Sequence, residues 1–314
     1  MGTLSNAALS LADFLRAEQL NFSFKISPER KKALDTIYDS ELKRIENMFH
    51  INTTKFIHRL AELVESPYKI DQGNYGLCVT ASFLYVIIKD YPEKFVAFAF
   101  ELLAKGKAKF GALSINTSAD FKAVDFPLVI KLERGAKAAT HHEADYFLLG
   151  AFRDSINSFY NVKFNDKNQP AVDESFPDQA SRYIKSLLID DSKAYSGVSD
   201  ELVSWFDETK LYKPTVQKLA GPTITEVELD SACKANETVI LEVHTNGNIN
   251  EFIPHQINPK KRHSCTIFSP SITFPADNKK MEFHLVTWGM IIPVECTKDA
   301  FKKALIGYLE VNTI

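Results

Sequence analysis

The sequence predicts an α+β fold in which a mainly helical first part precedes a β-rich second part. Apolar residues recur at helical spacing through most of the chain up to about residue 222. From residue 223 on, short runs rich in β-branched and aromatic residues alternate with turn residues. These patterns divide the chain into a helical leader (1–66), a helical lobe (67–222) and a β-rich lobe (223–314).

The composition is that of an ordinary folded protein. Hydrophobic residues make up 45% and charged residues 25% of the 314 positions, which is enough apolar material for one large core or two smaller ones. The formal net charge of -3 and the lack of a dense Lys/Arg run argue against a nucleic-acid partner. No stretch reaches the roughly 18 apolar residues of a membrane span. The start of the chain also lacks the features of a secretory signal. We therefore expect a cytoplasmic protein, or one exported without an N-terminal signal peptide, of unknown oligomeric state.

The leader is expected to consist of helices over residues 9–15, 28–47 and 53–64. Ser27 and Pro28 open the second of these in the way that helix starts favour. The leader is either a regulatory pro-segment or the first packed part of the fold. Nothing in it marks a cleavage site.

A polar, glycine-containing stretch leads into Cys78, and an apolar helix pattern follows at once. Gly73 and Gly76 give the backbone freedom for a tight approach to a helix start. A cysteine in the first turn lies among unpaired N–H groups at the positive end of the helix dipole, which favours the nucleophilic thiolate. Gln72, six residues earlier, is expected to direct a side-chain N–H at the carbonyl oxygen that Cys78 attacks, forming an oxyanion hole.

Further elements are expected on both sides of residue 223. The expected helices cover residues 93–105, 140–152, 177–188, 199–206, 224–235 and 298–305. The expected strands cover residues 128–130, 238–244, 264–268, 281–288 and 308–311. Residues 112–140 are otherwise expected to form a loop, as are residues 161–176, and residues 207–222 have the Pro and Gly content of a linker.

The pattern Gln-Gly-x-x-Gly-x-Cys at the start of a helix resembles the nucleophile segment of the papain-like cysteine peptidases. The resemblance implies a papain-like two-lobed fold, with Cys78 as the nucleophile and Gln72 as the oxyanion donor. It covers about a dozen residues, and such local signatures are specific to families. Tyr75, Leu77 and Val79 depart from it, since the family usually has a disulfide cysteine, Ser and Trp at these positions.

His284 is the expected general base, because it lies on a strand pattern well after the cysteine, in the order that the resemblance implies. His244, His255 and His263 are rival bases; His244 and His263 lie at strand ends and are expected to be more exposed. His50 and His58 are expected to be structural. Cys265 and Cys296 are expected to be inert packing thiols.

The sequence does not decide which group orients the imidazole of the general base. The candidates are Glu295, Glu242, Asp299 and a main-chain carbonyl. Asp299 suits a helix start better, because Thr297 just before it is a favourable N-cap.

Adjacent histidines and acidic residues at 141–145 suggest a metal site, but neighbouring helical residues point about 100° apart. The helix dipole is a sufficient reason for Glu143 and Asp145. No metal or cofactor is therefore expected.

Together these residues imply a cysteine-dependent hydrolase of amide bonds, a peptidase or amidase acting on a protein or peptide substrate. A bacterial effector or toxin is one biological setting for such an enzyme. The alternative is a catalytically inactive binding protein on the same scaffold, which the missing third residue and the missing Trp after Cys78 favour. A metal-dependent hydrolase around His141 and His142 is a third, weaker hypothesis.

Overall fold

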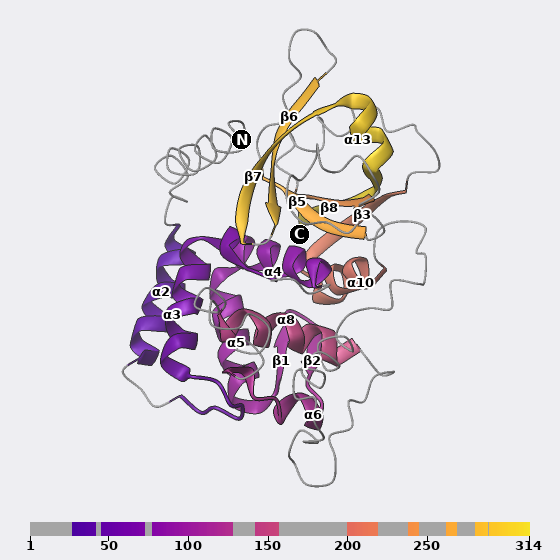
Figure 1. Ribbon diagram of the computed structural model, residues 1–314. Coiled ribbons are helices and arrows are strands. Elements are labelled where there is room, and N and C mark those ends of the chain that lie inside the picture. Colours follow the sequence, from indigo (N-terminus) through magenta and orange to yellow (C-terminus); the bar gives the residue numbers. More distant parts are fainter. Residues whose placement is uncertain are drawn as a thin grey trace, which may run out of the picture.

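The structure is a computed structural model (Figure 1) that describes residues 27–41, 45–72, 77–127, 142–156, 200–218, 238–244, 262–268, 280–287 and 289–314. Its helices are α2 (Pro28–Glu41), α3 (Thr53–Glu65), the short 3-10 helix η1 (Pro67–Lys69), α4 (Cys78–Asp90), α5 (Pro92–Lys105), α6 (Ala119–Lys122), α8 (Glu143–Ile156), α10 (Asp200–Thr209) and α13 (Lys298–Ala304). Its strands are β1 (Lys107–Phe110), β2 (Leu113–Asn116), β3 (Tyr212–Lys218), β4 (Thr238–His244), β5 (Arg262–Ile267), β6 (Lys280–Thr287), β7 (Met290–Thr297) and β8 (Leu305–Thr313).

Six of the strands form one antiparallel sheet in the order β3-β8-β4-β5-β6-β7. The side chains of β6 alternate across this sheet, as a pleated strand requires. Phe283 and Leu285 belong to a core cluster on one face, where Phe283 meets Phe301 of α13 at 5.7 Å between ring centres. Val286 belongs to the larger cluster shared with the helices. Both faces of the sheet are therefore covered.

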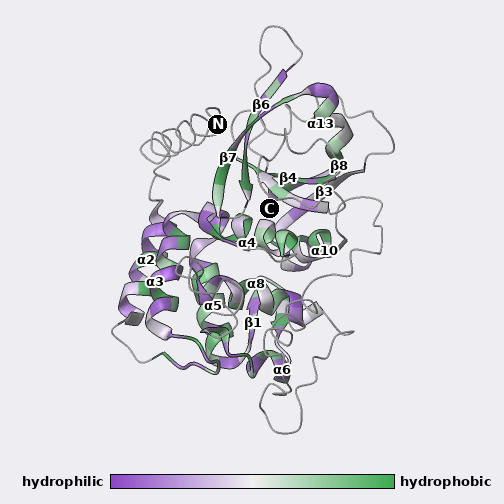
Figure 2. Ribbon diagram, viewed as in Figure 1, coloured by the Kyte–Doolittle hydropathy of each residue, from purple (hydrophilic) through white to green (hydrophobic). Residues whose placement is uncertain are grey.

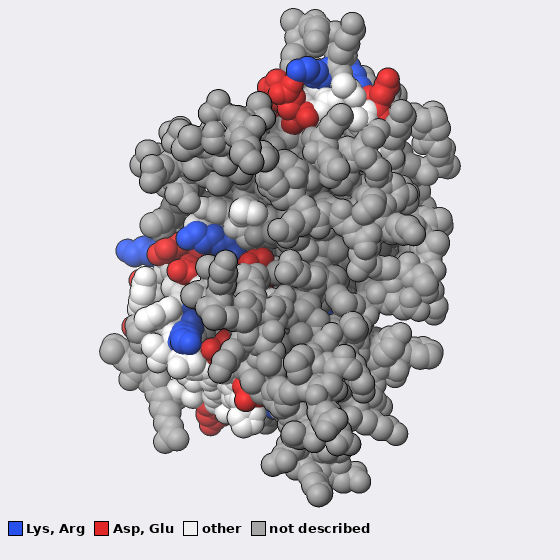
Figure 3. Space-filling model, in the orientation of Figure 1, with Lys and Arg blue, Asp and Glu red and all other residues white. Residues whose placement is uncertain are grey.

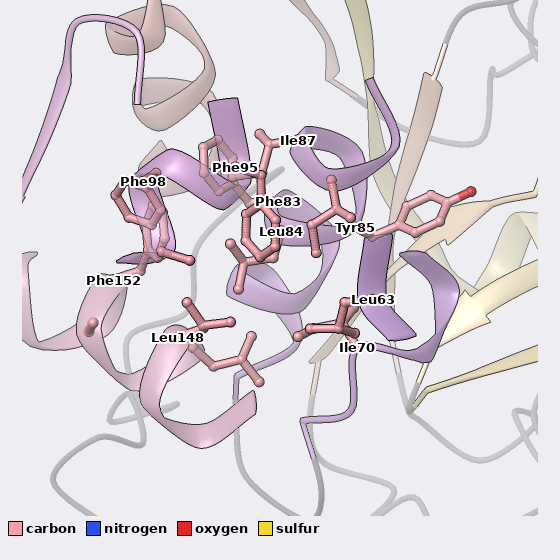
Figure 4. Packing of buried hydrophobic residues seen from close by; sticks show 14 of the residues in the cluster. Leu63, Ile70, Phe83, Leu84, Tyr85, Ile87, Phe95, Phe98, Leu148 and Phe152 are labelled. Atoms are coloured by element: carbon pink, nitrogen blue, oxygen red, sulfur yellow. The ribbon is translucent and has the colours of Figure 1, made fainter. Parts of the chain in front are cut away.

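Helix α4 is the central element of the fold. All residues from Thr80 to Ile88 are buried, as expected for a helix that is apolar on all sides. It packs against β5 and β6 on one side and against α5, α8 and α10 on the other. Phe83 lies 5.2 Å from Phe152 of α8 and 4.8 Å from Phe206 of α10 between ring centres. Figure 4 shows this aromatic packing from close by.

Hydropathy and charge follow this layering. Figure 2 shows the outer helix α2 as largely hydrophilic and β7 as hydrophobic where it approaches α4. On the face drawn in Figure 3, acidic and basic side chains of the described residues lie close together, without a large patch of one sign. Within the described part of the chain, no helix has the length and apolar character needed to cross a membrane.

The mixture of helices and one large sheet confirms the predicted α+β class. The predictions for α3, α10, β4 and the end of the chain are close to the observed bounds. The expected helix over residues 28–47 ends at Glu41 instead, and residues 45–48 are irregular. The expected elements at 9–15, 128–130, 177–188 and 224–235 lie outside the described residues, as does the loop expected at 161–176.

Two expected irregular regions contain strands. Residues 107–116 form the hairpin β1–β2, although a loop was expected from residue 112. Residues 212–218 form β3, which pairs with β8 along its full length, where a linker was expected. Pro214 suggested a break in regular structure, but β3 is an edge strand, where proline is tolerated. The sequence pattern also indicated no strand at 290–297, which form β7.

Candidate functional site

Cys78 is the first residue of α4, and its side chain is half-buried. The residue that caps this helix end is Leu77, whose side chain has no hydrogen-bond acceptor. The first turn also contains no acidic residue. The backbone N–H groups beside Cys78 are therefore not used by a capping side chain of Leu77, and they favour negative charge at this point.

Two side-chain contacts fix the direction in which α4 crosses the sheet. Ser264 Oγ of β5 donates to Ser82 Oγ at 3.3 Å, and Lys89 Nζ donates to Thr238 Oγ1 at the start of β4 at 2.7 Å. The helix therefore runs from the end of the sheet where β5 begins to the end where β4 begins. Cys78 is one turn before Ser82 on the same side of the helix. It thus lies at the end of the sheet where β5 begins.

His263 lies at this same end of the sheet. It is the second residue of β5, next to Ser264, and only 5% of its surface is exposed. Its Nε2 lies 2.6 Å from Oγ1 of Thr287, the last residue of β6. Burial lowers the pKa of the His263 imidazole to about 4, so the ring is neutral at pH 7. A neutral ring held through one nitrogen can accept a proton on the other.

Cys265, two residues after His263, is buried on β5, and burial raises the pKa of its thiol, with further increases from Glu242 and Cys78. Helix α4 packs on this strand through Ser82 and Ser264. The nucleophile candidate and β5 are therefore close together.

The expected base, His284, is half-buried near the middle of β6. Its backbone oxygen accepts a hydrogen bond from the N–H of Phe268 at 2.9 Å, which places the two residues level with each other. Phe268 is four residues beyond Ser264, or about 13 Å at roughly 3.3 Å per residue of strand. The register thus places His284 away from the Cys78 end of the sheet. His263 lies at that end, but side chains alternate along a strand, so its side chain lies with that of Cys265 on the face opposite Ser264 and α4.

Gln72 is buried, with 4% of its surface exposed, at the end of a segment that packs against the β6–β7 turn. Gly289 in that turn has φ +70°, and a Cβ there would lie 3.0 Å from the Lys69 oxygen and 3.1 Å from Asp71 Cβ. This contact brings the Gln72 segment to the same end of the sheet as His263 and Thr287. Residues 73–76, with both expected loop glycines and Tyr75, lie outside the described residues.

The structure describes the surroundings of the three expected carboxylates. Glu242 is buried on β4 and pairs with Ser264 in the sheet. Glu295 on β7 is exposed and forms an ion pair with Lys280. Asp299 lies in the first turn of α13, which Thr297 caps through a 3.1 Å bond from the Ala300 N–H, as predicted.

Thr287, which does contact His263, was missed because the expected partner was a carboxylate, an amide or a main-chain carbonyl. Its position at the end of a strand pattern, two residues before a glycine, was the available signal.

The acidic residues at 143–145 have structural partners. Glu143 Oε2 accepts from the Asn52 N–H at 3.1 Å, and Asp145 forms a buried ion pair with Arg59. Among the described residues, no group of three His, Cys, Asp or Glu side chains is arranged to hold a metal. His141 lies outside the described residues.

The remaining thiols and histidines are easily placed where they are described. Cys265 and Cys296 are buried in the sheet core, in agreement with packing roles. His58 is exposed on α3, and His50 is exposed in an isolated bridge with Asp125. The side chain of His244 and all of His255 and Cys233 lie outside the described residues.

A comparison with known proteins finds no matching family model, no similar curated protein and no similar solved structure. The chemistry of this site is therefore argued from its own residues.

Proposed function

We propose that the protein is a cysteine-dependent hydrolase of amide bonds, with Cys78 as the nucleophile and one of the histidines of the β-rich part as the general base. The observation that carries the proposal is the half-buried Cys78 at the head of α4, where backbone N–H groups and the helix dipole favour its thiolate, with the buried Gln72 in the segment before it. A nucleophile, a base and a third group that orients the base are the parts that covalent acyl transfer requires.

The reaction follows from the protonation states. A neutral histidine keeps a lone pair on one ring nitrogen. This nitrogen takes the thiol proton as the sulfur of Cys78 attacks the amide carbon and the C–S bond forms. Gln72 and a backbone N–H of α4 stabilise the oxyanion. The C–N bond breaks as the histidine returns the proton to the leaving amine, and water then hydrolyses the acyl-enzyme.

Two features support a papain-like arrangement of these parts. The cysteine opens a buried central helix between a helical layer and an antiparallel sheet, and the candidate histidines follow on strands much later in the chain. A protein or peptide amide remains the substrate class that this arrangement fits.

The test is the alkylation rate of Cys78 by iodoacetamide at pH 6.5, with the labelled residue identified by peptide mass spectrometry. One substitution among His244→Ala, His255→Ala, His263→Ala and His284→Ala is expected to lower this rate at least tenfold, because general bases contribute about 10²–10⁴-fold in acyl transfer. The other three serve as controls and are expected to leave the rate within about twofold. The proposal is wrong if Cys78 stays unlabelled in the folded protein, or if none of the four substitutions slows labelling.

A catalytically inactive binding protein on the same scaffold is the second candidate. The burial of His263, with 5% of its surface exposed, is the observation that favours it, because a buried ring has little access to substrate. In that case Cys78 would react with iodoacetamide no faster than an ordinary half-exposed cysteine, and none of the four substitutions would change its rate.

A further inference from the structure

Arg59 of α3 and Asp145 of α8 form a buried ion pair beneath the segment that leads to Gln72. Arg59 Nε donates to Asp145 Oδ1 at 2.9 Å, and Arg59 Nη2 donates to Oδ2 at 2.8 Å. The two side chains are 6% and 1% exposed. Two parallel bonds between planar groups hold both partners in one geometry.

The same two side chains also bind the backbone of the Gln72 segment. Arg59 Nη2 donates to the Lys69 carbonyl at 2.7 Å, and Asp145 Oδ2 accepts from the Asp71 N–H at 3.0 Å. These two bonds lie on either side of Ile70, which is itself in the core with 2% of its surface exposed. The chain immediately before Gln72 is therefore held on both sides by one ion pair.

The contact continues from this segment to the histidine. Gly289 packs against Lys69 and Asp71, and it is two residues from Thr287, which contacts His263. The ion pair is therefore connected through Gly289 and Thr287 to His263, at the end of the sheet where β5 begins.

A need for stability alone does not account for this pair. Removing two charges from water costs about as much as their attraction returns, and a well-packed apolar pair of similar size is often as stable. What the ion pair supplies in addition is a fixed set of hydrogen bonds to Lys69 and Asp71. Apolar side chains cannot make these bonds.

We propose, on the basis of the function proposed above, that Arg59 and Asp145 are positioning residues of the oxyanion hole. They act through Gln72, by fixing the backbone of residues 69–71 from which it extends. Loss of the pair should therefore reproduce the loss of Gln72 itself, with little effect on the nucleophilicity of Cys78.

Two small probes separate these effects. Iodoacetamide reacts by displacement of iodide as the S–C bond forms, so its reaction develops no oxyanion. p-Nitrophenyl acetate reacts at its carbonyl carbon: the S–C bond forms, p-nitrophenolate leaves with the electrons of the broken C–O bond, and water later releases acetate. Only the second reaction passes through an oxyanion, so the ratio of the two rate constants reports on the oxyanion hole.

The main variant is the double substitution Arg59→Met with Asp145→Leu, which removes both charges and keeps the volume similar. We expect its acylation rate with p-nitrophenyl acetate to fall at least tenfold, while its alkylation rate stays within about twofold of wild type. Gln72→Ala is expected to give the same pattern. Combining Gln72→Ala with the double substitution should cause no further loss, because both remove the same interaction.

Arg59→Lys is a second, milder variant, because lysine keeps the charge but not the two-pronged geometry. We expect a smaller fall of acylation in the same direction. Arg30→Met is the matched control: Arg30 is a buried arginine that donates to the carbonyls of Val64 and Lys89, away from the Gln72 segment. It is expected to lower the melting temperature without changing the ratio of the two rates.

The positioning role is refuted if the folded double variant acylates within twofold of wild type. It is also refuted if both rates fall equally, or if the losses multiply with Gln72→Ala. Should the double variant fail to fold, Arg59→Lys decides between the same outcomes. A wild-type protein whose Cys78 reacts with neither probe would instead refute the proposed hydrolase function, so the two failures are distinguishable.

Discussion

The burial of His263 predicts a pH dependence of stability that can be measured without a substrate. Burial lowers the pKa of this imidazole from an ordinary 6.5 to about 4, because the protonated ring is poorly solvated there. The unfolded chain therefore binds a proton at a higher pH than the folded protein does. The resulting contribution to the free energy of unfolding is complete above pH 6.5 and is lost as the pH falls from 6.5 towards 4.

The magnitude follows from the size of the pKa difference. At about 1.4 kcal/mol per unit, the full contribution is about 3 kcal/mol. At pH 5 the ring would be protonated in most unfolded molecules and in few folded ones, so about 2 kcal/mol is lost relative to pH 7.

The assay is urea unfolding of wild type and His263→Gln at several pH values between 4 and 7. Glutamine stays neutral at every pH. Subtracting the free energies of unfolding of the two proteins at each pH therefore cancels the contributions of other titrating groups, such as Asp90 and Asp154. We expect the wild type to lose about 2 kcal/mol more than the variant between pH 7 and pH 5. Parallel curves for the two proteins would refute the claim that His263 is buried in its neutral form.

Three further predictions concern packing and backbone geometry. Thr287→Val removes the hydroxyl next to His263 and is expected to cost about 1–3 kcal/mol in urea unfolding, with Thr287→Ser restoring most of it. Gly289→Ala is expected to cost about 1–3 kcal/mol in the same assay, because alanine is strained at a φ of +70° and its Cβ would crowd the Lys69 oxygen. Phe83→Ala is expected to cost about 3–5 kcal/mol, since the fully buried ring contacts aromatic side chains from α8 and α10.

For each of these substitutions, the contradicting result is a free energy of unfolding within 0.5 kcal/mol of wild type, which is the usual range of neutral surface changes. Such a value would mean that the substituted residue does not make its contact: Thr287 with His263, Gly289 with Lys69, or Phe83 with the aromatic rings of α8 and α10.

Local patterns predicted the local parts of this structure well. The glycine-containing stretch and the apolar run after it predicted Cys78 in or next to the first turn of a helix, and it is the first residue of α4. The run from Thr238 to His244 matched β4 at both ends, since its β-branched residues alternate between two buried faces. Thr297 was recognised as an N-cap from its own chemistry.

The parts that local patterns could not supply depend on pairing between distant segments. The positions of His263 and His284 relative to Cys78 depend on the register of β5 against β6 and on the direction of α4 across them. The pairing of β3 with β8 overrode a proline that suggested a linker. The Arg59–Asp145 pair joins residues 86 positions apart, so the sequence alone gave Asp145 only the role of an acidic residue at a helix start.

The most direct test is thiol–thiol crosslinking of Cys78 to a cysteine placed at position 264 or at position 284, using a short bifunctional reagent such as dibromobimane. Both substitutions, Ser264→Cys and His284→Cys, would be made with Cys265→Ala to remove the neighbouring thiol. The structure predicts a crosslinked peptide containing Cys78 for Ser264→Cys, because Ser264 contacts Ser82 one turn after Cys78, and none for His284→Cys. A crosslink to position 284 alone would contradict the placement of the nucleophile at the end of the sheet where β5 begins.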